Sequence, residues 1–243
     1  MTWTPGVSDD DARVMIRAIE DIYDLMRGQF GKPGQFDPLP VVRIFGAWMI
    51  PSLPPDAAYA NVGYYVERSL DDTRDRILGS RYLDLVRLEP WQSTSPHFDL
   101  AMTNLKLEDD LETAQASRRA KPGMPALKVD RPGLLALIST FPFDSIESQD
   151  LRRLAIRHMV AHAFGRLMGI PRRGRTEAVI QHLGDRYCAN TCAMRLTDTP
   201  TLALSFAQQE LASGVLYCDL CKQDLASQIT GCLLYTSPSP RDS

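Results

Sequence analysis

Two closely spaced pairs of cysteines near the C-terminal end constrain this chain more than any other feature. Three residues separate Cys188 from Cys192, two separate Cys218 from Cys221, and 25 residues lie between the pairs. Four thiolates in two such pairs match a closed, tetrahedral four-cysteine zinc site. Four buried free cysteines are the alternative, but scattered cysteines do not usually fall into two close pairs. We therefore predict a structural zinc ion.

Composition limits the class of protein. The 243 residues are 44% hydrophobic, which suffices for one globular domain or a domain with a small annex. The sequence contains no run of about 18 apolar residues, so we expect no membrane span. Residues 1–10 lack the features of a signal peptide, so we expect a cytoplasmic protein. In that reducing compartment cysteines are better interpreted as metal ligands than as disulfides.

The charge argues against a nucleic-acid partner. The formal net charge is −3, which gives no general attraction to nucleic acid or to acidic membranes. A zinc ribbon for nucleic acid is the other functional interpretation of the cysteines. Basic and aromatic clusters are lacking around them, so this interpretation is disfavoured.

A second metal-ligating pattern lies in residues 157–169. His158 and His162 stand four residues apart, so a helix places them on one face, where they can hold one metal ion. In an H-E-x-x-H helix the residue after the first histidine is a general-base glutamate, but here it is Met159. In the longer form of that motif, a glycine at the position of Gly165 ends the helix, and a third histidine stands where this chain has Met168. Ordinary core histidines bonded to backbone carbonyls are the alternative.

Hydrophobic patterning predicts alternating helices and strands, and hence an α/β fold. Helices are predicted over 9–28, over 56–79 and from Ser148 through both histidines. Strands are predicted over 41–50, 82–88, 97–105 and 134–141. Residues 107–121 are predicted to form a surface excursion, and the basic run 171–175 a solvated turn.

The last residues need separate treatment. Residues 232–243 resemble the translation of a transposase adapter used in DNA library preparation. We infer that the reading frame ran into adapter sequence, and we exclude this segment, with Cys232, from the interpretation of the fold.

The order of these motifs resembles the archaemetzincins, metzincin-clan zinc peptidases with a catalytic zinc, a Met-turn and a second zinc held by four cysteines. The resemblance covers about residues 98–221. It implies a mixed twisted sheet, a long active-site helix and a small C-terminal four-cysteine zinc subdomain. It also implies two regions. Residues 1–170 would form an α/β metallopeptidase-like domain, and residues 171–231 a C-terminal Met-turn and four-cysteine zinc-binding region. Residues 99–104 resemble the family's strand before the catalytic helix, and 136–140 its edge strand.

The resemblance also assigns roles to single residues. His158 and His162 take the first two catalytic-zinc ligand positions, and Met194 takes the Met-turn position beneath the metal. The structural-zinc positions fall on Cys188, Cys192, Cys218 and Cys221.

This sequence departs from the family at the catalytic residues. Met159 replaces the general base, and the third histidine is missing. Its position is Met168 when counted from Gly165 and Tyr187 when counted from Cys188. We therefore expect a catalytically impaired protein that binds a peptide or protein ligand. The alternative is an active zinc-dependent peptidase whose third ligand is His182 or Tyr187.

Overall fold

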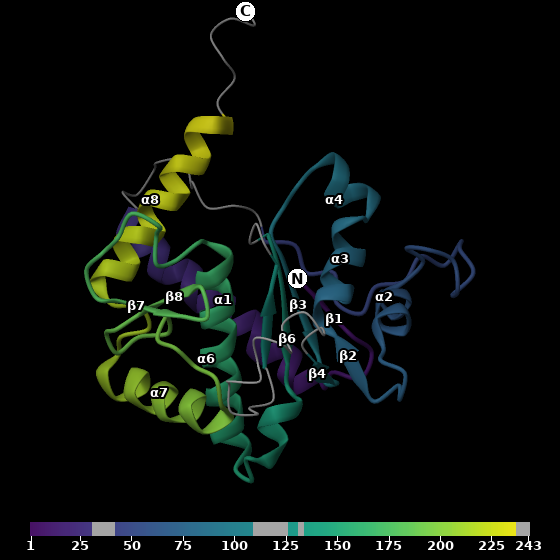
Figure 1. Cartoon of the computed structure of the whole chain (residues 1–243), viewed down its shortest axis with the longest axis horizontal. Coiled ribbons are helices and arrows are strands. Elements are labelled where there is room, and N and C mark those ends of the chain that lie inside the picture. The colour runs from purple at the N-terminus through teal and green to yellow at the C-terminus, as the bar shows by residue number, and fades with distance from the viewer. Residues whose placement is uncertain (31–41, 109–125, 131–133, 237–243) are drawn as a thin grey trace, which may run out of the picture.

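The computed structural model describes residues 1–30, 42–108, 126–130 and 134–236, and a mixed four-stranded sheet lies at their centre (Figure 1). The strand order is β1 (Thr2–Trp3), β3 (Asp99–Thr103), β6 (Leu135–Ser139) and β5 (Leu127–Val129). The first three strands are parallel, and β5 is antiparallel to β6. The predicted α/β class with a mixed sheet is confirmed.

Helices cover both faces of this sheet. On one face lie α1 (Asp9–Phe30) and α6 (Gln149–Leu167), and on the other lie α2 (Val62–Ser69) and α3 (Gly79–Arg87) (Figure 1). Successive side chains of a strand point to opposite faces. Accordingly Leu100 and Met102 belong to the cluster with α1 and α6, whereas Ala101 belongs to the cluster with α2 and α3. Burial on both faces explains why these strands are continuously apolar.

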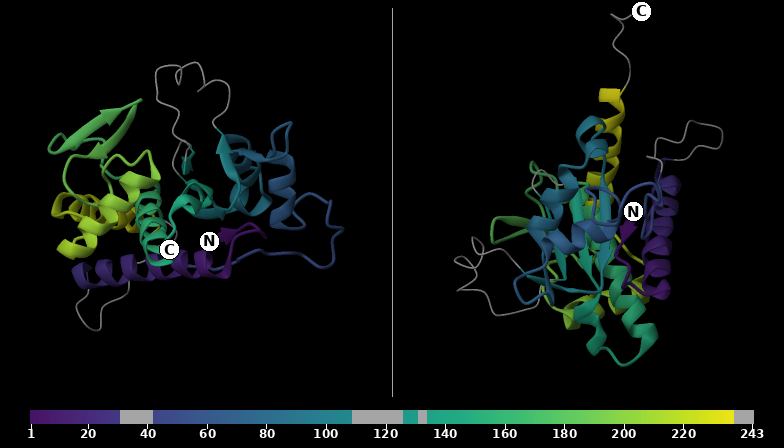
Figure 2. Two further views of the ribbon diagram at one scale, coloured as in Figure 1. Left: turned by 90° about the horizontal axis from the view of Figure 1, so that it is seen from below. Right: turned by 90° about the vertical axis from the view of Figure 1, so that its right-hand side faces the viewer.

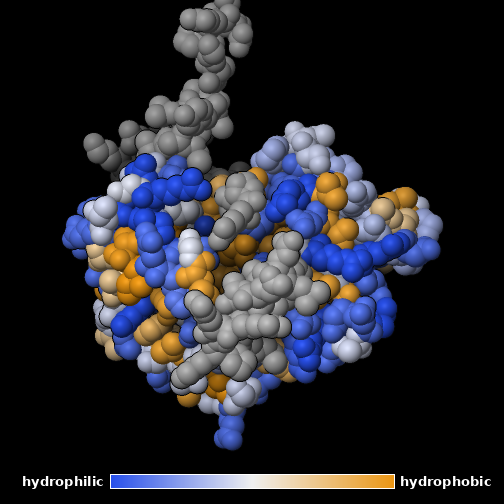
Figure 3. Space-filling model, viewed as in Figure 1, coloured by the Kyte–Doolittle hydropathy of each residue, from blue (hydrophilic) through white to orange (hydrophobic). Residues whose placement is uncertain are grey.

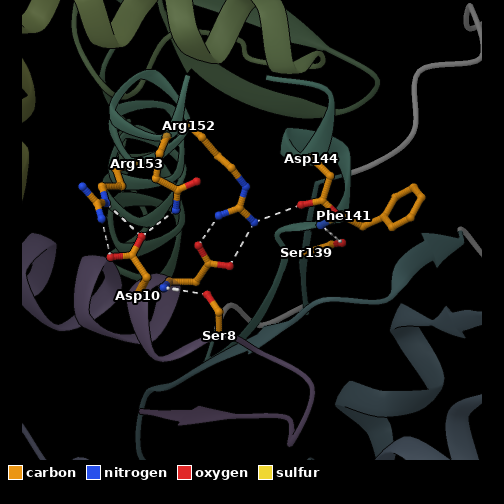
Figure 4. Close-up of polar contacts among 9 residues, drawn as sticks. Ser8, Asp10, Ser139, Phe141, Asp144, Arg152 and Arg153 are labelled. Carbon is orange, nitrogen blue, oxygen red and sulfur yellow. Dashed lines mark hydrogen bonds and ion pairs between the residues drawn. The ribbon is translucent and has the colours of Figure 1, made fainter. Parts of the chain in front are cut away.

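The two helices of the first face are joined where they begin (Figure 4). Ser8 caps α1 and Ser148 caps α6, each accepting a backbone N–H three residues ahead. Arg152 of α6 contacts Asp11 of α1 through both terminal nitrogens, and one of them also lies 3.0 Å from Asp144. The Arg152 and Asp11 side chains are only 12% and 3% exposed. This buried ion pair fixes the start of the helix that carries the histidines.

Several predicted elements differ in the structure. The predicted strand over 41–50 is wrong, because within 42–50 only isolated bridges form and Ile44 and Met49 are exposed. The predicted strand over 82–88 is also wrong, since α3 occupies it. The predicted helix over 56–79 is shorter, and β2 (Arg76–Leu78) follows it and pairs with β4 (Lys106–Glu108). A short helix, α4 (Pro90–Thr94), leads towards β3.

Two assignments made from the resemblance are corrected by the sheet order. Strand β6, which contains most of 136–140, is an inner strand because β5 pairs with its free side. The strand that directly precedes the histidine helix is also β6, and the 3-10 helix η1 (Phe141–Ser145) connects the two. Residues 99–104 lie earlier in the chain, so they are not that strand.

The C-terminal part packs around α6. It contains the hairpin β7 (Val179–His182) and β8 (Asp185–Cys188), then α7 (Pro200–Ser213) and α8 (Asp219–Thr236). Figure 2 shows the hairpin and α1 on opposite sides of α6. Helix α8 continues into the segment predicted to be adapter-derived, and 237–243 lie outside the described residues. The division at residue 170 stays a prediction, although one hydrophobic cluster contains residues from both sides of it.

The surface is mixed in character. Apolar and hydrophilic residues are interspersed on the face seen in Figure 3. Ile180 and Leu183 of the β7–β8 hairpin are 44% and 64% exposed. Within the described ranges, no helix has the length and apolar character needed to cross a membrane.

Candidate metal centres

The four predicted cysteines meet in one cluster. The sulfur atoms of Cys188, Cys192, Cys218 and Cys221 all lie within 4.8 Å of one another. Cys188 Sγ is 3.6 Å from Cys218 Sγ, and Cys192 Sγ is 3.8 Å from Cys221 Sγ. Zinc–sulfur bonds of about 2.3 Å in a tetrahedron place the sulfurs about 3.8 Å apart, whereas a disulfide needs about 2 Å. The donor set and its spacing therefore fit a four-cysteine zinc site.

Backbone hydrogen bonds shape the loop between the first two cysteines. Cys188 N–H donates to the Met194 carbonyl over 2.8 Å, which closes the loop that follows β8. Ala193 N–H donates to the Leu216 carbonyl, also over 2.8 Å, and draws in the segment before α8. Cys221 lies in the first turn of α8, where the positive end of the helix dipole favours a thiolate.

The four thiols perturb one another. Hydrogen bonding with Cys192 lowers the pKa of Cys188 to about 7, and hydrogen bonding with Cys188 lowers the pKa of Cys218. The same contacts, together with burial, raise the pKa values of Cys192 and Cys221. A zinc ion held by these four residues would supply the positive charge that ionises all four thiols, because a coordinating thiol is deprotonated.

The two histidines of α6 are buried in the protein body, as predicted. His158 is fully buried, and its Nδ1 lies 2.9 Å from Oε1 of Glu210 in α7. Its Nε2 lies 3.1 Å from the hydroxyl oxygen of Thr197. Because a carboxylate accepts, Nδ1 is the donor in the first contact. Carboxylates fix metal-binding histidines in the same way, but here the Thr197 hydroxyl contacts the nitrogen that would face an ion.

His162 is held similarly by the residue that follows Cys192. Its Nδ1 lies 2.6 Å from the Ala193 carbonyl, so Nδ1 carries the proton and Nε2 keeps its lone pair. Burial, with the nearby charge of His158, lowers the pKa of His162 to about 3. The ring is therefore neutral near pH 7, which is the form that binds metals. The two imidazole rings lie 6.4 Å apart between centroids.

Gly165 has a different role from the predicted one. Helix α6 runs on to Leu167, and Gly169, with φ of 67°, makes the turn. Glycine at residue 165 makes room for Met194, because a Cβ there would lie 2.1 Å from the Met194 sulfur and would force that side chain to shift. Met194 is fully buried against this glycine, about one turn beyond His162. This contact with the histidine helix depends on the close approach that Gly165 permits. The Met-turn position of Met194 beneath a metal stays a prediction.

The other residues singled out in the sequence, Met159, Tyr187 and His182, differ in how far they are buried. Met159 is 2% exposed and packs in the hydrophobic cluster. The Tyr187 ring stacks on His162 with 6.0 Å between centroids, and the Arg166 guanidinium lies 5.0 Å from the centroid of the same tyrosine ring. Burial raises the pKa of Tyr187.

His182 is exposed at the tip of the hairpin. In the described part of the chain, no third His, Cys, Asp or Glu forms a group with both histidines whose ligand atoms all lie within 4.8 Å of one another.

Sequence reasoning missed the groups that hold the histidines. Glu210 is 4% exposed and stands 52 residues from His158. Thr197 and the Ala193 carbonyl are also remote from α6 in the sequence. The available signal was that Glu210 is the one charged residue of α7, and a carboxylate that is fully buried is almost always paired.

The path of the chain matches a known structure. A crystal structure of an archaemetzincin from Methanopyrus kandleri aligns with a TM-score of 0.53 over 94% of this chain and 93% of that chain. The fold is archaemetzincin-like. The two sequences are 13% identical, so the likeness between this chain and the archaemetzincin concerns the fold. No protein-family model matches the sequence, and no curated protein matches it either.

Proposed function

We propose that this chain is a zinc-binding protein with an archaemetzincin-like fold in which peptide hydrolysis is impaired, and which binds a peptide or protein ligand. The observation that carries the proposal is the position of Met159. It is buried in α6 directly after His158, at the position where the resemblance places the general base. Its thioether cannot accept a proton from a water molecule at neutral pH.

The size of the defect follows from general acid–base catalysis. A positioned base contributes about 10²–10⁴-fold, or about 3–5 kcal/mol of activation free energy. Catalytic zinc sites also use about three protein ligands and keep one open position. The histidine pair supplies two imidazole nitrogens, and its orientation by Glu210 and Ala193 suits a metal. The missing third ligand would weaken retention of that ion.

The test is cleavage of a peptide library with and without a chelator. The unmodified chain should show no chelator-sensitive cleavage. Met159→Glu alone and Tyr187→His alone should stay inactive, because each leaves the other defect in place. The double variant should gain activity, since groups that act as one catalytic unit are non-additive. Met159→Leu and Tyr187→Phe serve as controls for packing at the same positions.

An active peptidase is the second candidate, and one contact favours it. The Tyr187 ring stacks on the His162 ring, and Tyr187 is at the family's third-ligand position counted from Cys188. His182 is the other candidate ligand. Chelator-sensitive cleavage by the unmodified chain, abolished by His162→Ala, would establish this candidate and overturn the first. Loss of that cleavage in Tyr187→Phe or in His182→Ala would identify the third ligand.

The setting of the proposed function is cytoplasmic. The free cysteines are consistent with a reducing compartment, where a four-cysteine site can stay intact. Fractionation of expressing cells, followed by detection of the chain, tests this placement.

A further inference from the structure

An arginine outside the predicted metal ligands contacts the cysteine cluster. The run 171–175 was expected to be a solvated turn, and Arg172 and Arg173 are indeed exposed. The side chain of Arg175, however, is only 8% exposed. Its Nη1 lies 3.5 Å from Cys221 Sγ and 2.8 Å from Asp224 Oδ2. One guanidinium nitrogen thus contacts both a cysteine of the cluster and a buried carboxylate.

The protein fixes this arginine from two sides. Asp224 also accepts the backbone N–H of Arg172 over 3.1 Å, so the carboxylate binds the loop as well as the guanidinium. Arg186 donates to the carbonyls of Arg172 and Arg175. A side chain that is placed in this way loses little further conformational entropy when it donates to a ligand.

The charges favour contact with thiolates. A zinc ion with four thiolates carries a net charge of −2, which is costly to bury without nearby donors or positive charge. The Arg175 guanidinium supplies such a charge, because arginine keeps its proton in proteins. Its Nε and Nη2 are buried and have no hydrogen-bond partner among the described residues. Asn190 Nδ2 donates to Cys218 Sγ over 3.5 Å on another side of the cluster.

We propose that Arg175 is a positioning residue of the four-cysteine zinc site: its guanidinium, aligned by Asp224, donates to the Cys221 thiolate and slows loss of the ion. Donors to metal-ligand atoms orient the ligands and stabilise their charged form, and their removal typically weakens metal binding by about 10–100-fold. The site is distinct from the histidine pair, so this inference does not depend on whether the chain hydrolyses peptides.

The experiment measures zinc transfer from the full-length chain to a chromophoric chelator. Arg175→Met should release zinc about 10–100-fold faster than the unmodified chain. Arg173→Met is the matched control, because that arginine is exposed in the same loop, and its release rate should be unchanged. Arg175→Lys should fall between the two, since an ammonium restores the charge but lacks the planar fork.

A spectroscopic readout separates this role from general stabilisation of the loop. With cobalt in place of zinc, the thiolate-to-metal absorption bands should shift in Arg175→Met and stay unchanged in Arg173→Met. Equal release rates and identical spectra for the two variants would overturn the proposal. If Arg175→Met does not fold, Arg175→Lys is compared with the unmodified chain. Identical release and spectra would again overturn the proposal.

Discussion

Substitution of Gly165 by alanine tests the packing that joins the histidine helix to Met194. An ideal Cβ at residue 165 would lie 2.1 Å from Met194 Sδ and 3.1 Å from its Cε. Favourable contacts between such atoms are about 3.5–4.0 Å long. Met194 is fully buried, so it has little room to move. Overpacking of this kind costs about 1–3 kcal/mol.

Helix propensity acts in the opposite direction. Alanine is about 1 kcal/mol more favourable than glycine inside a helix. Gly165→Ala should therefore change the free energy of unfolding by about 0–2 kcal/mol in the destabilising direction. In a Met194→Ala background the clash is absent, and the same substitution should stabilise by up to about 1 kcal/mol. The coupling free energy between the two positions is then about 1–3 kcal/mol.

The assay is urea unfolding of the two single variants and the double variant in zinc-saturated buffer. Gly28→Ala is the control, because Gly28 is also helical and a Cβ there would have no neighbour within 4 Å. It should be neutral or stabilising. If Gly165→Ala stabilises the chain as much as Gly28→Ala, and the cycle is additive within about 0.5 kcal/mol, the close approach of Met194 is refuted.

Three further predictions concern other contacts, and two of them carry a matched control variant. Cys218→Ser should lower zinc content and melting temperature together, because structural zinc binding is folding free energy; unchanged zinc content would contradict the four-cysteine site. Arg152→Met should cost about 3–5 kcal/mol in urea unfolding, since it leaves the Asp11 carboxylate buried and unpaired. Arg153→Met, at a much more exposed ion pair, should cost far less, and equal losses would refute this distinction. Glu210→Ala should destabilise by about 1–3 kcal/mol by removing an acceptor from a buried histidine. Glu210→Gln should cost less, because its amide oxygen can still accept, and the reverse order would contradict the assigned donor.

The elements that sequence analysis predicted correctly are those with strong local signals. The helix after Ser148 has a cap and a long apolar pattern, and β3 and β6 are short apolar runs that are buried on both faces. The cysteine spacing predicted a cluster because metal ligation requires the four sulfurs to meet. In each case a few neighbouring residues carry the information.

The predictions that failed concern segments whose structure depends on contacts with residues distant in the sequence. Residues 42–50 have β-branched and aromatic side chains, but a strand needs a partner, and the sheet is completed by β1 and β5 instead. Residues 82–88 alternate over too short a length to exclude a helix, and in α3 the neighbouring Tyr82 and Leu83 are both buried. The role of Gly165 depends on a methionine 29 residues away, which no local pattern indicates.

The most direct test is an anomalous difference map, recorded at the zinc absorption edge, from crystals of the chain purified without added metal. A single strong peak is expected among the sulfurs of the cysteine cluster, at about 2.3 Å from each. Because two histidines alone hold zinc weakly, the proposed lack of a third ligand predicts a much weaker peak, or none, at His158 and His162. No peak among the four sulfurs would contradict the four-cysteine site. An equally strong peak at both histidines, completed by a third protein ligand, would contradict the impaired site and favour the active peptidase.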